Sequence, residues 1–149
     1  MVSHKYELTE DGRAVTTVAL RGAGTGTRFT LSGVDYQVRV HKISGVSELV
    51  DGAGSIVAST DRVNREWNLT SSGRVVVFRQ TAMMAREYTM IGDNGAPAGT
   101  IRRIGRGETT AELPGLDLLV QVFALVVVML RRRRKQVGVA VRSSGIAHG

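Results

Sequence analysis

Five consecutive cations are the residues of this sequence whose types and spacing point most directly to a chemical role. They are Arg131, Arg132, Arg133, Arg134 and Lys135, and they directly follow a long apolar run. Each such charge contributes about 1 kcal/mol beside an anionic lipid surface, and nucleic-acid phosphates attract it as well. The structural alternative is a helix cap, because cations stabilise the carboxyl end of a helix. Four successive arginines spread around a helix axis, which favours a rim or interfacial position over a binding groove.

Two other segments invite a phosphate-binding interpretation. Arg102, Arg103 and Arg106 form a second basic cluster, but neighbours in a strand face opposite ways, so solvated charges are the simpler interpretation. The glycine-rich segment 21–27 has Thr27 where a dinucleotide fingerprint has its third glycine, and it lacks the Lys-Ser/Thr ending of a P-loop. A hairpin loop is expected there.

Residues for catalysis or metal binding are sparse. His4, His41 and His148 lie far apart without a second ligand at metal-binding spacing, cysteine is absent, and no serine sits in a G-x-S-x-G motif. Asp117 is expected to cap a helix, and Gln121 to satisfy a backbone group of the surrounding strands. The sequence therefore predicts a non-enzymatic protein with no metal and no cofactor.

Short strands separated by turns account for residues 4–112. Val34, Tyr36, Val38 and Val40 alternate with polar residues and predict a strand with one dry face. Residues 75–78 form a continuous apolar run bounded by Arg74 and Arg79, as in a strand covered on both faces. Further strands are predicted at 65–69, 86–90 and 100–104, with Trp67 and Leu69 inward. Turn pairs such as Asp-Gly and Ser-Gly separate about ten strands before residue 113, which is typical of an antiparallel sandwich or barrel.

An apolar run follows at residues 116–130 and predicts a helix, because no turn residue interrupts it. Such a helix must be buried all round. It spans about 22 Å, short of a bilayer core of about 30 Å but matched to a seven-residue strand of about 23 Å. We therefore expect a helix threaded through a barrel; the alternative is an integral membrane protein with 116–130 inserted and the basic run cytoplasmic. The expected central-helix core residues are Leu119, Val122, Phe123, Val126, Val127 and Leu130.

The fold class expected is thus mainly β: an antiparallel closed or nearly closed barrel of about 10–12 strands around a central hydrophobic C-terminal helix. One domain is expected at 1–142, with the helix at about 115–133, a last strand at 137–141 and a flexible tail at 143–149. The 149 residues fit one core, and 42% of them are hydrophobic. The formal net charge is +7, but without the basic run it would be +2. Charge alone therefore does not argue for nucleic acid, and the inward phase of Tyr36, Trp67 and Tyr88 argues against it.

The order of these elements resembles the tubby C-terminal-like superfamily, and most of all its LURP-one-related and phospholipid scramblase-like proteins. Segment 87–95 with 99–101 resembles the repeated strand–turn–strand unit of that family, and 35–38 with 51–56 a looser copy. Segment 113–117 followed by 122–127 resembles the proline-led start of its central helix. The resemblance implies a closed barrel of about a dozen strands around the helix. It also implies association with membranes and lipids.

The function expected is non-enzymatic binding of an anionic phospholipid surface or of a protein partner. Arg131–Lys135 are the expected contact, and the location expected is cytoplasmic, peripheral at the inner membrane surface. The integral membrane protein is one alternative, and a nucleic-acid-binding module is the second.

Overall fold

Strands dominate the computed structural model, and a long helix lies among them. The structure describes residues 3–21, 26–81, 87–104, 108–135 and 142–146, with the side chains of all of these except 3–5, 20, 21, 104, 132–135 and 142–146. In this part of the chain, β1 (Ser3–Glu10) and β2 (Arg13–Arg21) pair as a hairpin, and ten strands form one sheet. These are β3 (Gly26–Leu31), β4 (Val34–Val40), β5 (Ser47–Val50), β6 (Ile56–Thr60), β7 (Glu66–Ser71), β8 (Arg74–Gln80), β9 (Glu87–Ile91), β10 (Pro97–Ile104), β11 (Glu108–Glu112) and β12 (Arg142–Ile146).

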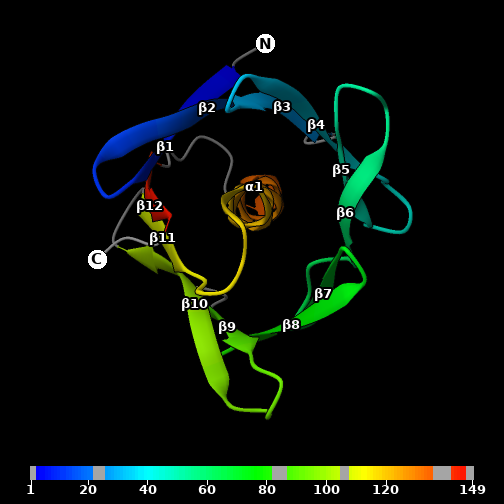
Figure 1. The fold of residues 1–149 in the computed structure, drawn as a ribbon, viewed down its shortest axis with the longest axis vertical. Coiled ribbons are helices and arrows are strands. Elements are labelled where there is room, and N and C mark those ends of the chain that lie inside the picture. Colours follow the sequence, from blue (N-terminus) through cyan, green and yellow to red (C-terminus); the bar gives the residue numbers. More distant parts are fainter. Residues whose placement is uncertain (1–2, 22–25, 82–86, 105–107, 136–141, 147–149) are drawn as a thin grey trace.

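Each strand of the large sheet pairs with the next along the chain. The pairs from β3 to β11 are antiparallel, and β12 lies parallel to β11. Figure 1 shows these strands around helix α1 (Leu118–Lys135), with the hairpin in the arc between β3 and β12. Within the described residues no ladder joins β2 to β3 or β1 to β12, so backbone pairing does not close the sheet. The mainly β fold with a C-terminal helix is confirmed.

Three tight turns follow from the residues that the sequence places in them. Both central residues have a positive φ at Asp11–Gly12 (51° and 82°), Ser32–Gly33 (51° and 78°) and Ser72–Gly73 (50° and 75°). Turns of this kind match the right-handed twist of the strands that they join, and glycine adopts them without steric cost. The chain therefore reverses here in short hairpins, which keeps sequential strands adjacent.

The core lies between the strands and the helix. Trp67 and Leu69 face inward as predicted, with exposed fractions of 1% and 0%. The Trp67 ring stacks on Phe78 with centroids 4.4 Å apart and meets Tyr88 edge-on at 5.9 Å. These aromatic contacts bind β7, β8 and β9 into one packed wall.

Two predictions for the strand faces were wrong. Strand β8 is not covered on both faces: Val76 and Phe78 are buried, but Val75 is 57% exposed, because the helix covers only the inner face of the sheet. In β4, Val38 is buried and Tyr36 and Val40 are half-buried against the core, as the alternation indicated. Val34 is exposed, because it adjoins the solvent-exposed turn between β3 and β4.

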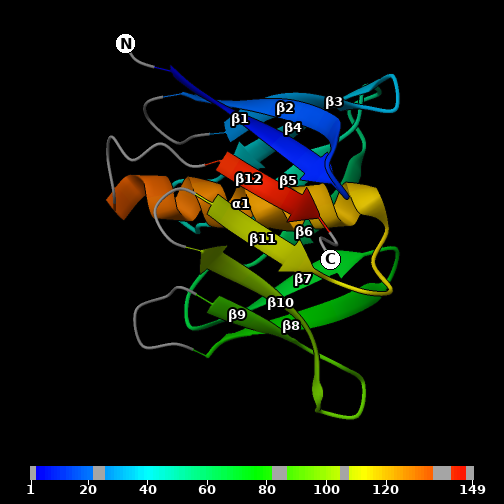
Figure 2. The ribbon, with the colours of Figure 1, turned by 90° about the vertical axis from the view of Figure 1, so that its left-hand side faces the viewer.

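The strands form a ring around helix α1, which runs through its centre, as Figure 2 shows from the side. All residues from Val120 to Leu130 are buried, which includes Val122, Phe123, Val126 and Val127; Leu119 is half-buried. Other parts of the protein thus cover residues 120–130 of the helix. Among the described helices, none has the length and apolarity needed to cross a membrane.

The ends of the domain differ from the predicted boundaries. The helix spans Leu118–Lys135, whereas about 115–133 was predicted. It begins at Leu118 because Asp117 takes the capping position, where its carbonyl oxygen accepts the first helical bond from the Gln121 backbone at 2.9 Å. Residues 143–146 of the predicted flexible tail belong to β12, which pairs with β11 in parallel. Residues 137–141 and 147–149 lie outside the described part.

Candidate functional site

Two rims of the ring follow from this up-and-down topology. We call the end that carries the 41–46 and 61–65 connections and the carboxyl end of α1 the helix-end rim. We call the end that carries the tight turns and the start of α1 the turn rim. Contacts hold the helix-end rim together. Arg131 is half-buried there, and its Nε donates a 3.0 Å hydrogen bond to the carbonyl oxygen of Val63.

The 41–46 connection is held in the same way. Arg62 Nη2 donates to the carbonyl oxygen of Ile43 at 2.5 Å, and Arg62 Nε donates to that of Ser44 at 3.2 Å. The Gly45 and His41 backbones pair at 2.7 Å, and Gly45 has a φ of +77°. A Cβ at Gly45 would lie only 2.7 Å from Arg62 Nε, so glycine lets the loop pack directly on this side chain. Two arginines from distant segments therefore meet at one rim.

A cavity of about 150 Å³ lies between these elements. Its apolar floor comes from α1 and the neighbouring strands, and its polar wall comes from two guanidinium groups, Asn64 and Ser47. Ser47 is only 3% exposed. Such a lining suits an anionic group better than a cation. The lining residues are Val40, Gly45, Ser47, Arg62, Val63, Asn64, Val127, Leu130 and Arg131.

The charges of the two rims differ in sign. The connections of the helix-end rim expose Lys42, Arg62 and Arg65, with Asp61 as their acidic side chain, and the α1 backbone carries the basic run on to Lys135. The turn rim carries five aspartates, with Arg13 and Arg74 as nearby cations. Arg74 donates there to the Gly115 carbonyl oxygen at 3.3 Å. The aspartates are Asp11, Asp35, Asp51, Asp93 and Asp117.

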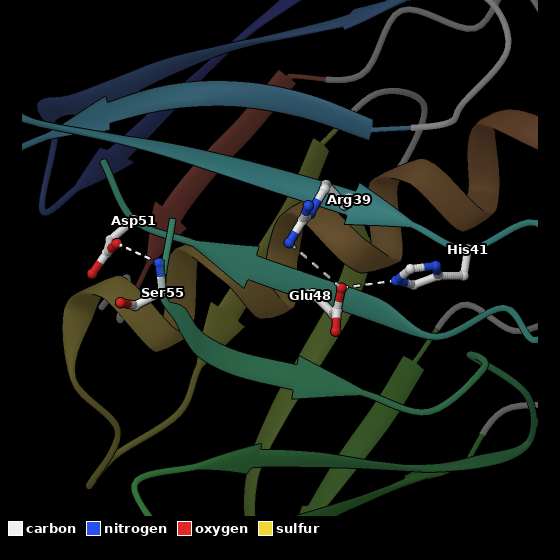
Figure 3. Close-up of polar contacts among 5 residues, drawn as sticks. All are labelled: Arg39, His41, Glu48, Asp51 and Ser55. Carbon is white, nitrogen blue, oxygen red and sulfur yellow. Dashed lines mark hydrogen bonds and ion pairs between the residues drawn. The ribbon is translucent and has the colours of Figure 1, made fainter. Parts of the chain in front are cut away.

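A polar cluster on the outer face of β4 and β5 is drawn in Figure 3. Glu48 Oε1 lies 2.8 Å from His41 Nε2 and 3.9 Å from an Arg39 guanidinium nitrogen. At the far end of β5, Asp51 Oδ1 accepts a bond from the Ser55 backbone at 2.9 Å and closes a turn. Among these five drawn residues, the acid and base groups face solvent on the outer wall. The cluster therefore links two neighbouring strands on the outer wall.

The second basic cluster does not form one patch within the described residues. Arg102 Nε donates to Glu87 Oε2 at 2.8 Å across β9 and β10. Hydrogen bonds from the Thr81 hydroxyl and from Arg102 lower the pKa of Glu87 below its usual range. Arg106 lies outside the described residues, as does segment 22–25 of the glycine-rich loop.

The polar residues of α1 are only partly as expected. Gln121 Nε2 donates to the Leu116 carbonyl oxygen at 2.8 Å, and its buried Oε1 has no hydrogen-bond partner among the described residues. The expectation that Gln121 satisfies a strand was wrong, because its amide bonds to the segment that precedes its own helix. Across the described residues, no three acidic or histidine side chains are grouped to hold a metal ion.

The sequence indicated Arg131 but missed the rest of the helix-end rim. Lys42, Ile43, Arg62 and Arg65 belong to no motif. The bonds from Arg62 to the 41–46 connection and from Arg131 to Val63 hold the two connections beside the end of α1. Alternation did place 41–46 and 61–65 between strands. An up-and-down order of the strands would also have placed both connections at the same end of the sheet, beside the end of the helix. Of the basic run, the structure describes the Arg131 side chain; for residues 132–135 it describes the helical backbone.

Comparisons with protein-family models, with curated proteins and with solved structures found no match to this chain. The geometry of the helix-end rim is therefore the guide to function.

Proposed function

We propose that this protein is a non-enzymatic domain that docks on anionic phospholipid membranes through its helix-end rim. The observation that carries the proposal is the convergence of Lys42, Arg62 and Arg131 from three separate segments at the point where α1 brings the basic run. Each cation near an anionic bilayer contributes about 1 kcal/mol, so the rim and the run together give substantial affinity.

The opposite charge of the turn rim supports an oriented approach. A negative surface attracts the helix-end rim and repels the five aspartates at the other end, so the dipolar charge distribution turns the molecule before contact. A basic patch spread over the outer wall would not orient the axis of the ring in this way. The helix axis is then expected to stand steeply on the membrane.

The cavity supports binding rather than catalysis. Its described lining offers guanidinium, amide and hydroxyl groups but no carboxylate or imidazole to move a proton. The interior of the ring is filled by α1, so a buried substrate would find no room there.

We propose further that the barrel architecture, the family and the cellular location suggested by the sequence apply to this chain. The hairpin and the large sheet together make a nearly closed barrel, and the chain belongs with tubby-like, scramblase-like domains that work at the cytoplasmic face of a membrane. The ring of strands around an apolar helix supports this assignment. A protein partner with an acidic face is the alternative ligand for the rim.

Vesicle sedimentation tests the proposal. The protein is expected to bind vesicles that contain phosphatidylserine, to bind neutral phosphatidylcholine vesicles far less, and to be released by salt as surface charges are screened. Lys42→Glu is expected to weaken binding at least several-fold. Arg13→Glu makes the same charge change at the turn rim and is the matched control.

Equal binding to neutral and anionic vesicles would overturn the proposal, and so would equal losses in Lys42→Glu and Arg13→Glu. Replacement of Arg132, Arg133 and Arg134 by Gln tests the basic run separately. Binding to an acidic protein but not to any vesicle would favour the alternative partner.

A further inference from the structure

Ile43 is the most exposed large apolar side chain among the described residues. Its exposed fraction is 94%, against 42% for Val34, 55% for Ile56 and 57% for Val75. The other three are strand residues near the turn rim, whereas Ile43 lies in the 41–46 connection of the helix-end rim. Burial of this large apolar side chain in a partner would be favourable, because it is almost wholly in water here.

The loop that presents Ile43 is not loose. Arg62 donates to two of its carbonyl oxygens, the His41 backbone bonds to Val46 at 2.9 Å, and the Val46 backbone bonds to the Ser44 hydroxyl at 3.2 Å. Gly45 packs against the Arg62 side chain. Because these bonds fix the backbone in advance, burial of Ile43 in a partner would cost little loop entropy.

Cations flank this apolar tip. Lys42 precedes Ile43, and the Arg62 guanidinium donates to the carbonyl oxygen of Ile43. A second copy of the chain would face these cations with its own in a symmetric contact, which is unfavourable. An anionic bilayer instead offers phosphate groups to the cations and acyl chains to the isoleucine at the same depth.

We propose that Ile43 is an apolar anchor that enters the boundary between headgroups and acyl chains, braced by Arg62. This inference rests on the proposed membrane function and deepens it by naming Ile43 as the residue that moves from water into the bilayer. The cations then supply salt-dependent attraction, and Ile43 supplies attraction that salt does not screen.

The first test compares two isoleucines on phosphatidylserine-containing vesicles. Ile43→Ser is expected to lower the partition coefficient roughly 10- to 30-fold, and to do so at low and at high salt alike. Ile56→Ser makes the same exchange at an exposed site near the turn rim and is expected to change it less than about 2-fold. Both sites are exposed, and circular dichroism checks that the fold is intact. An Ile43→Ser variant that binds as tightly as Ile56→Ser would overturn the anchor.

The second test uses the absence of cysteine from the chain. Ile43→Cys and Ile56→Cys each accept one environment-sensitive thiol dye. On vesicles the dye at position 43 is expected to shift to shorter wavelength and to be quenched by nitroxide lipids, whereas the dye at 56 stays in water.

The two failures can be told apart. If the protein binds no vesicles, the proposed function fails together with the anchor. If it binds and Lys42→Glu releases it, but the dye at 43 stays in water, only the anchor fails. A dimer in solution that Ile43→Ser dissociates would assign the side chain to a second copy and overturn the proposal.

Discussion

The guanidinium of Arg131 is hydrogen-bonded through Nε to the carbonyl oxygen of Val63, 3.0 Å away and 68 residues earlier in the chain. This bond ties the end of the central helix to the connection between β6 and β7. Val63 is itself buried, so Arg131 is bonded to the carbonyl group of a packed residue. Because Arg131 also lines the cavity, one side chain has both a structural and an electrostatic role.

Substitution of Arg131 separates these two roles. Arg131→Met removes both, and we expect it to lower the free energy of unfolding by about 1–2 kcal/mol and to weaken vesicle binding. Arg131→Lys keeps the charge but not the planar guanidinium, so it should restore most of the vesicle binding and only part of the stability. Urea denaturation and vesicle sedimentation measure the two effects. Equal recovery of both by lysine would contradict the division of roles.

A charge in the middle of α1 is expected to unfold the whole domain. Val126 is completely buried, and Val126→Asp places an unpaired carboxylate in the apolar core, at a cost of at least about 3 kcal/mol. Val75→Asp makes the same change on the outer face of β8 and should cost less than about 1 kcal/mol. Thermal melts followed by circular dichroism distinguish them. A Val126→Asp variant that keeps folded strands would show that the helix is not part of their core.

The alternation of strand residues and the turn chemistry predicted most of this fold. Trp67 and Leu69 face inward, and the Ser72–Gly73 turn has the positive φ values that its residue types favour. These are local properties, because side-chain spacing and backbone sterics decide them within a few residues. The exposure of Val75 could not be predicted in this way, since it depends on which face of the sheet the helix covers.

The candidate site was less predictable, because it is assembled from loops. Arg62 and Ile43 are 19 residues apart and share no motif, and their contact requires the pairing of β5 with β6, the two strands that lie between them. Gln121 shows the same limit on a smaller scale. Its polar character in an apolar helix predicted a hydrogen bond, but the choice of Leu116 as acceptor depends on how the chain turns before the helix.

Stability in acid is expected to depend on Glu87. The Thr81 hydroxyl donates to Glu87 Oε1 at 2.7 Å, and Arg102 donates to Oε2, so the pKa of Glu87 is lower in the folded chain than its usual 4.5. The folded state therefore favours the ionised carboxylate. Its stabilisation is present above the unfolded pKa and is lost as the pH falls through the folded one. The group is partly exposed, so the effect is less than about 1 kcal/mol.

The check is a series of urea midpoints from neutral pH to pH about 3, which brackets the ordinary range of carboxylates. Glu87→Gln should flatten the acid limb of the curve. Thr81→Val should partly flatten the acid limb in the wild-type protein. In the Glu87→Gln variant, Thr81→Val should leave the shape of that limb unchanged. A Thr81→Val effect that persists without Glu87 would assign the slope to another group.

The seam between the hairpin and the large sheet is expected to open first. No ladder joins β2 to β3 in the described residues; side-chain hydroxyls bridge them instead, from Thr16 to the Thr30 carbonyl oxygen at 2.6 Å and from Thr27 to that of Ala19. A groove of about 550 Å³ marks this seam on the surface.

The double variant Thr16→Val, Thr27→Val removes both bridges at nearly constant volume, whereas Thr17→Val, an exposed neighbour on the same strand, is the control. Hydrogen exchange should then speed up in β1 and β2 while β7 and β8 keep their protection, because separate units open with separate free energies. Equal acceleration in β7 and β8 would mean instead that the ring unfolds as one cooperative unit and that the two threonines serve its global stability.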